Sequence, residues 1–389
     1  MKILIANNNM KLGGVQKSLC NLLWELHRQG EHQVTLLLLK PVGEYMQMLP
    51  PDVACIAAEN PIALMGIGQG ECRGVDKLKR GYFAALCRLF GRKTAVRQML
   101  LGQETLAGEY DCAIAFLHNG GTRSFVGGVQ ELVLERVNAK RKIAFIHGDY
   151  GRNGGKNPDN DALLARFDRI AACSDGCAKA LIAALPELAD RVVTVRNCHN
   201  IPQIRTLAEN APMEYDRSRT NILCVARLSA TKGIDRALRA VAAALQENYP
   251  VTLHVVGSGP EEEKLHTLAK ELGILGQVCF YGAQTNPYRY LKNADLFLLT
   301  SHHEAAPMVI DEAYLLGIPT LTTKTSSSEE MVTRRNCGWV CENNQQDLNR
   351  MLLEILRDPE ALRKQKENLR NCQMDNEAAM QQFAQALER

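Results

Sequence analysis

The sequence lacks the features that mark several large classes of protein. No apolar run approaches the ~18 residues that a membrane-spanning helix needs. The apolar start at Met1 is interrupted by Asn7–Asn9, as in a first strand and its loop rather than a signal peptide. The formal net charge of +3 is too small to indicate a nucleic-acid partner. Thirteen cysteines occur without a Cys-x-x-Cys pair, so we expect reduced, mostly buried thiols in a cytoplasmic protein rather than a metal finger.

Short apolar runs alternate with helical segments along the chain, and 389 residues are too many for one ordinary core. Such alternation implies parallel sheets with right-handed crossovers. Strands are expected in two series, at residues 2–6, 33–39, 112–117, 142–147, 169–173 and 192–195, and then at 221–226, 251–256, 277–281, 295–300 and 320–323. The sequence therefore predicts an α/β protein of two doubly wound, Rossmann-like domains, with residues 1–200 in the first and 201–374 in the second.

The stretch from Ala294 to Ala313 carries the most information about function. Its first residues are typical of a buried strand, and Pro307 then opens a helix. Glu304 would lie at the carboxyl end of the strand, and Glu312 on the same side of the helix. The free amides at the helix start would form an anion site between them. A solvated helix start would also explain two isolated glutamates. The surrounding sequence is therefore needed to distinguish a ligand site from a solvated helix start.

The spacing Glu304-x7-Glu312, followed by Gly317–Pro319, resembles the signature of retaining, nucleotide-sugar-dependent glycosyltransferases of the GT-B fold, family 4, also called glycosyl transferases group 1. The family includes enzymes that build bacterial surface polysaccharides. The resemblance covers nearly the whole chain and is most specific over residues 221–332. It implies two domains that face each other across a cleft, with a last helix at about 375–389 that completes the first domain.

The resemblance assigns the nucleotide-sugar donor to the second domain. Arg227 and Lys232, in the loop after strand 221–226, would clamp the diphosphate. Glu312 would accept hydrogen bonds from the ribose, and Glu304 would act in catalysis at the transferred sugar. The other donor-binding residues that we expect are Tyr281, Pro307, Met308 and Val309, together with Gly13 and Gly14 of the first domain. An alternative for Tyr281 is that it packs in an aromatic cluster around its loop.

The first domain is expected to supply a catalytic group and the acceptor site. His147 ends strand 142–147 and matches by position the family's histidine beside the transferred sugar. Asp149 and His118 are assigned to the acceptor side. Gly13 and Gly14 precede a helix, where they would let the backbone approach the diphosphate and the acceptor.

The chain departs from the family pattern at two positions. Ala305 stands where the family usually has glycine, and Gln16 where it often has glutamate. The run Asp159–Asp161 has the form of a metal-binding Asp-x-Asp, but it lies in a loop before a helix, so we expect Asp159 or Asn160 to cap that helix. No metal and no cofactor besides the nucleotide sugar is therefore predicted.

Residues 73–97 combine eight basic side chains with one acid and with apolar residues at helical spacing. A basic amphipathic helix can lie on an anionic membrane, although an ordinary solvated helix is the alternative. Because many proteins of the family build lipid-linked glycans, we expect this segment to bind the inner face of the plasma membrane. The eight residues are Arg73, Lys77, Lys79, Arg80, Arg88, Arg92, Lys93 and Arg97.

These expectations combine into one function. We expect a cytoplasmic, retaining, metal-independent hexosyltransferase that moves a hexose or N-acetylhexosamine from a UDP-linked donor to a polyprenyl-linked saccharide in surface polysaccharide or capsule synthesis. A sugar-nucleotide epimerase of the same architecture is one alternative, and it would carry catalytic carboxylates in the first domain without Glu-x7-Glu. A non-catalytic partner subunit is another, and it should have lost the glutamates or Arg227 and Lys232. A dehydrogenase would need a third glycine after Gly257 and Gly259, which is absent.

Overall fold

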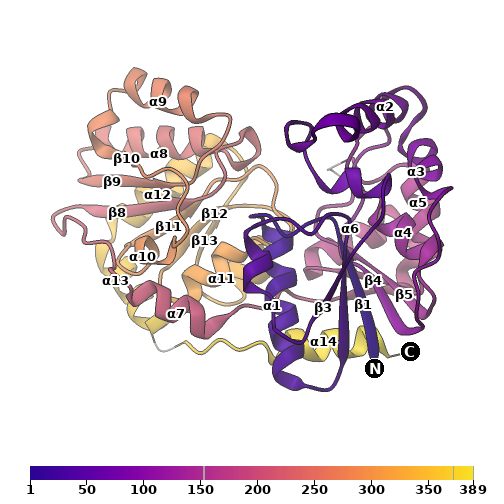
Figure 1. Cartoon of the computed structure of the whole chain (residues 1–389). Coiled ribbons are helices and arrows are strands. Elements are labelled where there is room, and N and C mark those ends of the chain that lie inside the picture. Colours follow the sequence, from indigo (N-terminus) through magenta and orange to yellow (C-terminus); the bar gives the residue numbers. More distant parts are fainter. Residues whose placement is uncertain (152–153, 371, 389) are drawn as a thin grey trace. The chain divides into compact units, whose positions relative to one another are not determined.

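The computed structural model describes residues 1–151, 154–370 and 372–388, which form two compact units (Figure 1). The first unit comprises Met1–His199 and Asn376–Arg389, of which Arg389 lies outside the described residues, and the second comprises Asn200–Asp375. Each unit is built on one parallel sheet flanked by helices. The predicted class, an α/β protein with two doubly wound sheets, is confirmed.

The first unit has a seven-stranded sheet in the order β3-β2-β1-β4-β5-β6-β7. Alternate residues of the interior strand β1 enter different cores, since Leu4 packs in one hydrophobic cluster and Ile3 and Ile5 pack in another. Both faces of the sheet are therefore covered. The strands are β1 Lys2–Asn7, β2 Gln33–Leu38, β3 Ala54–Ala57, β4 Tyr110–Ala115, β5 Ala139–Ile146, β6 Arg169–Ala172 and β7 Val192–Thr194.

The helices of the first unit connect these strands or follow the second unit. They are α1 Gly14–Gln29, α2 Gly74–Phe90, α3 Arg92–Leu100, α4 Val129–Arg136, α5 Pro158–Leu164, α6 Asp175–Ala184 and the C-terminal α14 Glu377–Leu387. Although α14 is far from the first strands in sequence, its Phe383 and Leu387 belong to the same core as Ile3 and Ile5. The end of the chain is thus part of the first unit.

The second unit has a six-stranded sheet in the order β10-β9-β8-β11-β12-β13. Its strands are β8 Thr220–Val225, β9 Val251–Val256, β10 Val278–Phe280, β11 Leu296–Leu299, β12 Thr320–Thr323 and β13 Gly338–Cys341. Its helices are α7 Ile201–Glu209, α8 Ile234–Gln246, α9 Glu262–Glu271, α10 Tyr288–Leu291, α11 Met308–Leu315, α12 Gln345–Arg357 and α13 Pro359–Arg370. Because the chain order reverses beside β8, the loops after β8 and β11 are neighbours at the carboxyl edge.

Three local expectations need correction. Strands β3 and β13, at the edges of the two sheets, are absent from the predicted series. Helix α11 begins at Met308, and Pro307 is its N-cap with an extended backbone rather than its first helical residue. Helix α5 is capped by Asn157, whose side chain accepts a hydrogen bond from the Asn160 amide, so neither Asp159 nor Asn160 is the cap.

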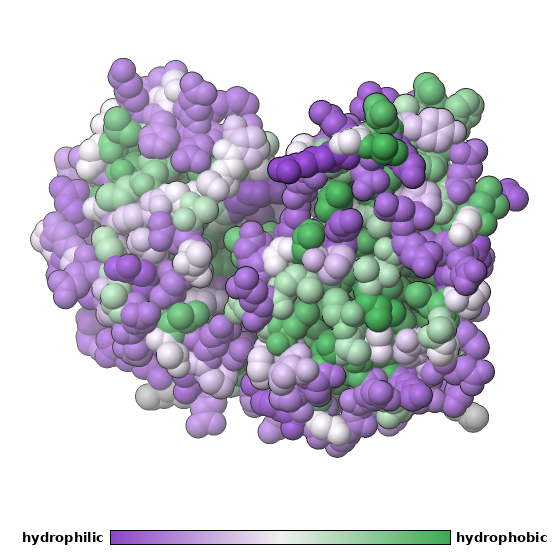
Figure 2. All heavy atoms as spheres, viewed as in Figure 1, coloured by the Kyte–Doolittle hydropathy of each residue, from purple (hydrophilic) through white to green (hydrophobic). Residues whose placement is uncertain are grey.

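The basic stretch forms two helices because Gly91, with φ of 86°, ends α2 and precedes α3. Apolar side chains lie exposed along α2, and Figure 2 shows apolar residues at the surface there. One predicted surface residue is buried instead: Arg92 is 1% exposed. The exposed apolar residues are Val75, Leu78, Tyr82, Leu89 and Phe90, and Leu101 follows α3.

Within the described ranges, no helix combines the length and the apolar character needed to cross a bilayer. None of the thirteen cysteines, which all lie in the described ranges, is in a disulfide, and ten of them are buried, so the expectation of mostly buried cysteines is confirmed.

Candidate functional site

Several loops pack against one another at the carboxyl edge of the second sheet. The loop after β8 is bonded to the loop after β9, where the Leu228 amide donates to the Ser258 carbonyl at 2.9 Å. It is also bonded to the end of β11, where the Thr300 hydroxyl donates to the Gly233 carbonyl at 2.6 Å. These bonds hold Arg227 and Lys232 on a supported loop rather than on a free one.

Two glycines of these loops are required by packing within the chain. Gly233 has φ of 61°, and a Cβ there would lie 2.4 Å from the Thr300 carbonyl oxygen. Gly257 has φ of 142°, and its Cβ would lie 1.9 Å from the Ala226 carbonyl oxygen. Any side chain at either position would push the loops apart. The close approach of the loops therefore depends on both glycines.

Lys232 and Glu304 meet directly at this edge. The Lys232 Nζ atom lies 2.6 Å from Glu304 Oε1, and the Ser301 hydroxyl donates to the same oxygen at 2.6 Å. The Glu304 side chain is 9% exposed and the Lys232 side chain 30%. Arg227, by contrast, is exposed and makes no ion pair with any described residue. The site thus contains one cation paired with a carboxylate and one that faces solvent.

The backbone of Glu304 is held as well. The Ser326 hydroxyl, from the loop after β12, donates to the Glu304 carbonyl at 2.8 Å, and the Thr323 hydroxyl donates to the Ser301 carbonyl at 2.7 Å. The sequence did not single out Ser301 or Ser326. The only signal for Ser301 was a hydroxyl residue at the carboxyl end of a buried strand.

Helix α11 starts beside these loops, and its N-cap residue, Pro307, makes no side-chain capping hydrogen bond. Pro307 and Val309 are half-buried and Met308 is buried. Glu312, in the second turn, is 3% exposed. An uncapped helix start carries unpaired backbone donors and the positive end of the helix dipole, which favour an anion.

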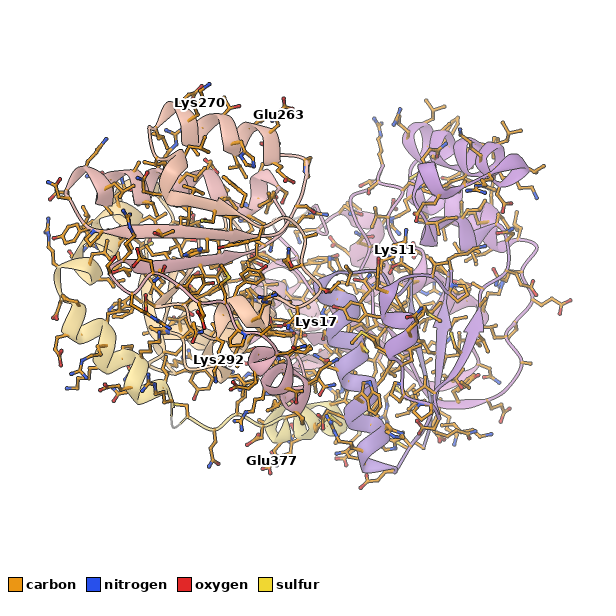
Figure 3. All side chains as sticks on the ribbon, turned by 60° about the vertical axis from the view of Figure 1, so that its left-hand side comes forward. Lys11, Lys17, Glu263, Lys270, Lys292 and Glu377 are labelled. Atoms are coloured by element: carbon orange, nitrogen blue, oxygen red, sulfur yellow. The ribbon has the colours of Figure 1, made fainter. Side chains whose placement is uncertain are left out.

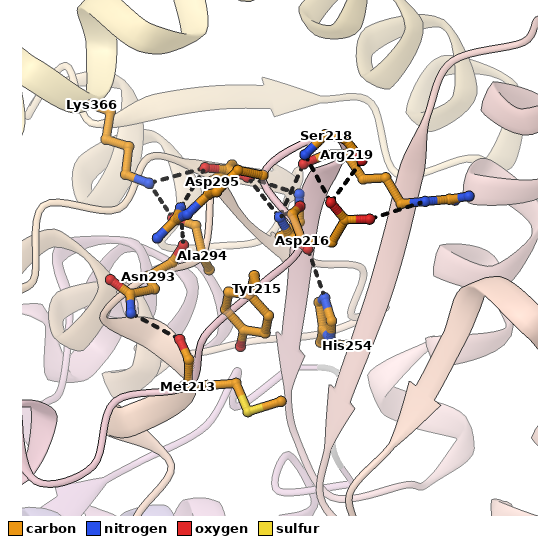
Figure 4. Close-up of polar contacts among 12 residues, drawn as sticks. Met213, Tyr215, Asp216, Ser218, Arg219, His254, Asn293, Ala294, Asp295 and Lys366 are labelled. Atoms are coloured by element: carbon orange, nitrogen blue, oxygen red, sulfur yellow. Dashed lines mark hydrogen bonds and ion pairs between the residues drawn. The ribbon is translucent and has the colours of Figure 1, made fainter.

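Tyr281, just after β10, belongs to a polar and aromatic cluster around His254, whose neighbour Tyr215 is drawn with it in Figure 4. Its hydroxyl lies 3.0 Å from His254 Nδ1, and its ring centroid is 4.6 Å from that of Tyr290. Asn221 Oδ1 lies 3.1 Å from His254 Nε2, while the Asn221 amide nitrogen donates to carbonyl groups and to Asp295. His254 Nε2 must therefore donate, and Nδ1 accepts from Tyr281.

This arrangement keeps His254 neutral, because burial lowers its pKa to about 4. The aromatic cluster that the sequence allowed for Tyr281 is present in the structure. The Tyr281 hydroxyl already has an internal partner in His254. The role of Tyr281 in donor binding stays a prediction.

In the first unit, the structure brings His147 and His118 together. The His147 amide donates to His118 Nδ1 at 3.3 Å, and the His147 ring packs 4.6 Å from Phe116. Burial is the main cause that lowers the pKa of His147 to about 3 and the pKa of His118 to about 4. His147 Nε2 is buried and has no hydrogen-bond partner among the described residues. Near neutral pH the His147 imidazole is therefore uncharged.

Gly13 is the N-cap of α1 and Gly14 its first residue, and a Cβ on Gly13 would meet only the flexible Gln16 side chain closely, with Oε1 2.5 Å away. Gly13 has an extended backbone, which any residue adopts, and a Cβ on Gly14 would meet no described atom within 4 Å. Lys11 and Lys17, which are labelled in Figure 3, flank these glycines in the sequence, and Lys11 is paired with Glu71. The space beside Gly14 is compatible with a ligand there.

Asp149 is half-buried and has a polar partner of its own. The Asp159–Asp161 run is likewise engaged, since Asp161 accepts from the Tyr150 hydroxyl at 2.7 Å and Asp159 lies 3.8 Å from Lys93. In the part of the chain that the structure describes, no group of three His, Cys, Asp or Glu side chains is placed to hold a metal ion. Metal independence stays a prediction.

Comparison with known families supports the resemblance. The family model "Glycosyl transferases group 1" matches residues 213–371, which include Arg227, Lys232, Glu304 and Glu312. An uncharacterised glycosyltransferase of Haemophilus influenzae is 34% identical over 142 residues, which are 36% of this chain and 40% of that protein. The lipopolysaccharide glucosyltransferase WaaG of Escherichia coli is 32% identical over 127 residues, or 32% of this chain and 34% of WaaG. The chain thus covers less than half of either relative.

Solved structures match over the whole chain. Anabaena HepE, crystallised with UDP and glucose, has a TM-score of 0.69 at 19% identity, and the match covers 100% of this chain and 99% of HepE. The structure of WaaG has a TM-score of 0.60 at 17% identity, with 99% and 98% covered. The resemblance to group 1 glycosyltransferases and the GT-B fold predicted from the sequence are therefore confirmed.

Proposed function

We propose that this protein is a retaining glycosyltransferase that takes a hexose or N-acetylhexosamine from a UDP-linked donor. The observation that carries the proposal is the contact between Lys232 and Glu304 beside the uncapped start of α11, inside the segment that matches the group 1 family. A cation, a carboxylate and free backbone donors at one sheet edge are the groups that a sugar diphosphate needs.

The donor would bind at this edge of the second unit. Arg227 and Lys232 would neutralise the diphosphate, and the amides of Met308 and Val309 would hold its distal phosphate. Glu312 would accept hydrogen bonds from the ribose. Pro307 shapes this turn, while Tyr281 would border the base. These positive groups would supply the field that a metal ion provides elsewhere, so no metal is required.

Transfer would proceed by attack of the acceptor hydroxyl on the face that the leaving diphosphate vacates. Glu304 would bind the sugar hydroxyls or stabilise the charge that develops at the anomeric carbon. The neutral His147 would bond the sugar from the first unit through Nε2, with His118 and Asp149 toward the acceptor. The leaving phosphate would help to deprotonate the acceptor hydroxyl. Gly13 and Gly14 would let the backbone close on the diphosphate.

We further propose that the acceptor is a saccharide linked to a polyprenyl carrier, used in surface polysaccharide synthesis at the cytoplasmic face of the membrane. The basic residues of α2 and its exposed apolar side chains would attach the first unit to anionic lipid. Several matched relatives are named as enzymes of lipopolysaccharide synthesis, which supports this class of acceptor.

The deciding experiment incubates the intact protein with a panel of nucleotide sugars. We expect UDP to raise the melting temperature, and one UDP-sugar to be hydrolysed slowly to UDP and free sugar. Retention would appear as the α-anomer of the sugar when it is first released from an α-linked donor. Conversion of one UDP-sugar into another without release of UDP would instead establish the epimerase. Absence of UDP binding would favour the non-catalytic subunit.

A further inference from the structure

The segment of residues 300–304, which carries Ser301 and Glu304, lies between β11 and α11 and is neither helix nor strand. Without such structure, its position depends on contacts with other elements. Four of its five backbone carbonyl groups accept a hydrogen bond from a side chain of another element. The donors are Thr323 to Ser301, Ser326 to Glu304, Arg236 to Thr300 and Asn343 to His302.

The side-chain amide of Asn343, in the loop after β13, links three other parts of the second unit. Its Oδ1 atom accepts a hydrogen bond from Arg236 Nη1 at 2.7 Å. Its Nδ2 atom donates to the His302 carbonyl and to the Lys324 carbonyl, each at 3.0 Å. Because a guanidinium group can only donate, Oδ1 must face Arg236, and both amide hydrogens then point to the two carbonyls. One amide group thus joins α8 to the loops after β11 and β12.

Arg236 is buried without a carboxylate partner among the described residues. It is 5% exposed, and its Nη1 atom donates to two neutral acceptors, Asn343 Oδ1 and, at 3.3 Å, the Thr300 carbonyl. A buried charge costs free energy that a charged partner would partly offset. An aspartate at position 343 would be such a partner, but it would lack the NH2 group that bonds the two loops. The asparagine therefore favours contact with the loops over neutralisation of the arginine.

We propose that Asn343 and Arg236 are positioning residues, which hold the segment 300–304 so that the Glu304 carboxylate stays where the sugar is transferred. The proposal rests on the function proposed above and adds two residues that act through the segment rather than on the donor. Arg236 fixes the Asn343 oxygen, and Asn343 holds the His302 carbonyl two residues before Glu304. Because a displacement of about 1 Å can lower a rate about a hundredfold, loss of these bonds should slow the reaction more than it weakens donor binding.

The test replaces Asn343 in the full-length protein and measures hydrolysis of the UDP-sugar that the wild type accepts. Asn343→Asp keeps an acceptor for Arg236 and makes it a charged one, but it removes both bonds to the loops. Asn343→Ala removes all three bonds. We expect each variant to lower kcat by about tenfold or more and to change KM by less than about threefold.

Hydrogen exchange gives a second measure that does not require activity. The His302 amide donates to the Thr231 carbonyl at 2.9 Å, and this bond should open more often once the segment is released. Mass spectrometry of the peptide with residues 300–306 should therefore show faster exchange in Asn343→Asp and Asn343→Ala. Wild-type kcat and wild-type exchange in Asn343→Asp would overturn the proposal, because the amide would then serve only as an acceptor for Arg236.

The neighbouring asparagine supplies a matched control. Asn344 caps α12, where its side chain accepts from the Asp347 amide at 2.8 Å. Asn344→Ala should lower the melting temperature but leave kcat and the exchange of residues 300–306 unchanged. An equal loss of kcat in Asn344→Ala and Asn343→Ala would overturn the proposal, because activity would then follow stability rather than the contact with the segment.

The part of Arg236 is tested by a double-mutant cycle. Arg236→Met keeps a long side chain without donors and should also lower kcat. The combined loss in Arg236→Met with Asn343→Ala should be smaller than the product of the two single losses, since the residues act through one contact. Independent effects would overturn the role of Arg236. Wild-type protein that hydrolyses no UDP-sugar would contradict the transferase proposal, while the exchange measurement would still decide whether Asn343 holds the segment.

Discussion

The ammonium group of Lys232 lies 2.6 Å from the Glu304 carboxylate, and that carboxylate also accepts from Ser301. Under the proposed function, a donor diphosphate that binds Lys232 would have to compete with Glu304 for it. Glu304 would then keep its bond to Ser301 and be free to bind the sugar. The pair would thus couple donor binding to the availability of the carboxylate.

Replacement of either cation should weaken donor binding. Arg227→Ala and Lys232→Ala should each reduce UDP affinity by about 1.5–3 kcal/mol, because each loses a charged hydrogen bond to the diphosphate. The effect of Lys232→Ala should fall toward the low end, since Lys232 first has to leave Glu304. Calorimetry with UDP measures both. Lys292→Ala, which removes an exposed ion pair with Glu209, is the control, and unchanged affinity in all three variants would rule out the clamp.

Replacements of Glu304 and Glu312 should have different effects on the steady-state kinetic constants and on UDP affinity. Glu304→Gln should lower kcat more than it raises KM, because its contact strengthens as charge develops at the sugar. It should also leave UDP affinity unchanged or higher, because Lys232 no longer has a charged partner. Glu312→Ala should mainly weaken UDP binding through the ribose. The reverse pattern would mean that the assigned roles are exchanged.

Activity should survive an excess of chelator. The positive groups proposed for the diphosphate are Arg227, Lys232 and the start of α11, none of which a chelator removes. Donor hydrolysis before and after treatment with EDTA measures this. If activity disappears and manganese or magnesium restores it, the proposal of a metal-free site is wrong.

The first unit should lose stability as the pH falls below about 6.5. Burial holds the pKa of His147 at about 3 and that of His118 at about 4 in the folded state, below the value of about 6.5 in the unfolded chain. The unfolded state therefore binds more protons in this range. Each histidine lowers the free energy of unfolding by about 1.4 kcal/mol for each unit by which the pH falls. In urea unfolding between pH 7.5 and 5, the free energy of unfolding should fall less for His147→Gln than for the wild type. The control is His303→Gln, which replaces an exposed histidine of the second unit. If the free energy of unfolding changes with pH by the same amount in both variants, the prediction is wrong.

Anionic vesicles should bind the protein through α2. Lys77→Glu, Lys79→Glu and Arg88→Glu together should abolish co-sedimentation at low salt, since each basic residue near such a surface contributes about 1 kcal/mol. Arg92 is left unchanged because it is buried against Glu131. Donor hydrolysis should be unaffected.

The apolar part of α2 is tested with Leu78→Ser and Leu89→Ser, which should weaken vesicle binding even where salt has screened the charges. Failure of the wild-type protein to bind at low salt would make α2 an ordinary solvated helix.

The sequence predicts the central strands of both sheets, because strands buried on both faces are continuous apolar runs. It does not predict β3 or β13, because neither is a continuous buried run: three of the four residues of β3 are exposed, and three of the four residues of β13 are only half-buried. Glu304 and Lys232 were found from spacing. Their contact with each other, and the part that Ser301 takes in it, depend on how the loops pack, which spacing does not encode. The burial of Arg92 could not be predicted from the sequence either, because its partners Glu131 and Asn160 lie 39 and 68 residues away in the chain.

The pairing of Lys232 with Glu304 also has a consequence for the order of folding. The two residues are 72 positions apart, and β9 and β10 are added to the sheet between them in the chain. Such non-local contacts form slowly, because the entropy of closing a long loop is lost before the contact contributes. A growing chain that has not yet reached β11 can make the Arg227 loop but not its carboxylate partner. Because the start of α11 and Glu312 also follow β11 in the chain, full donor affinity would appear during refolding only after β8 and β11 have paired.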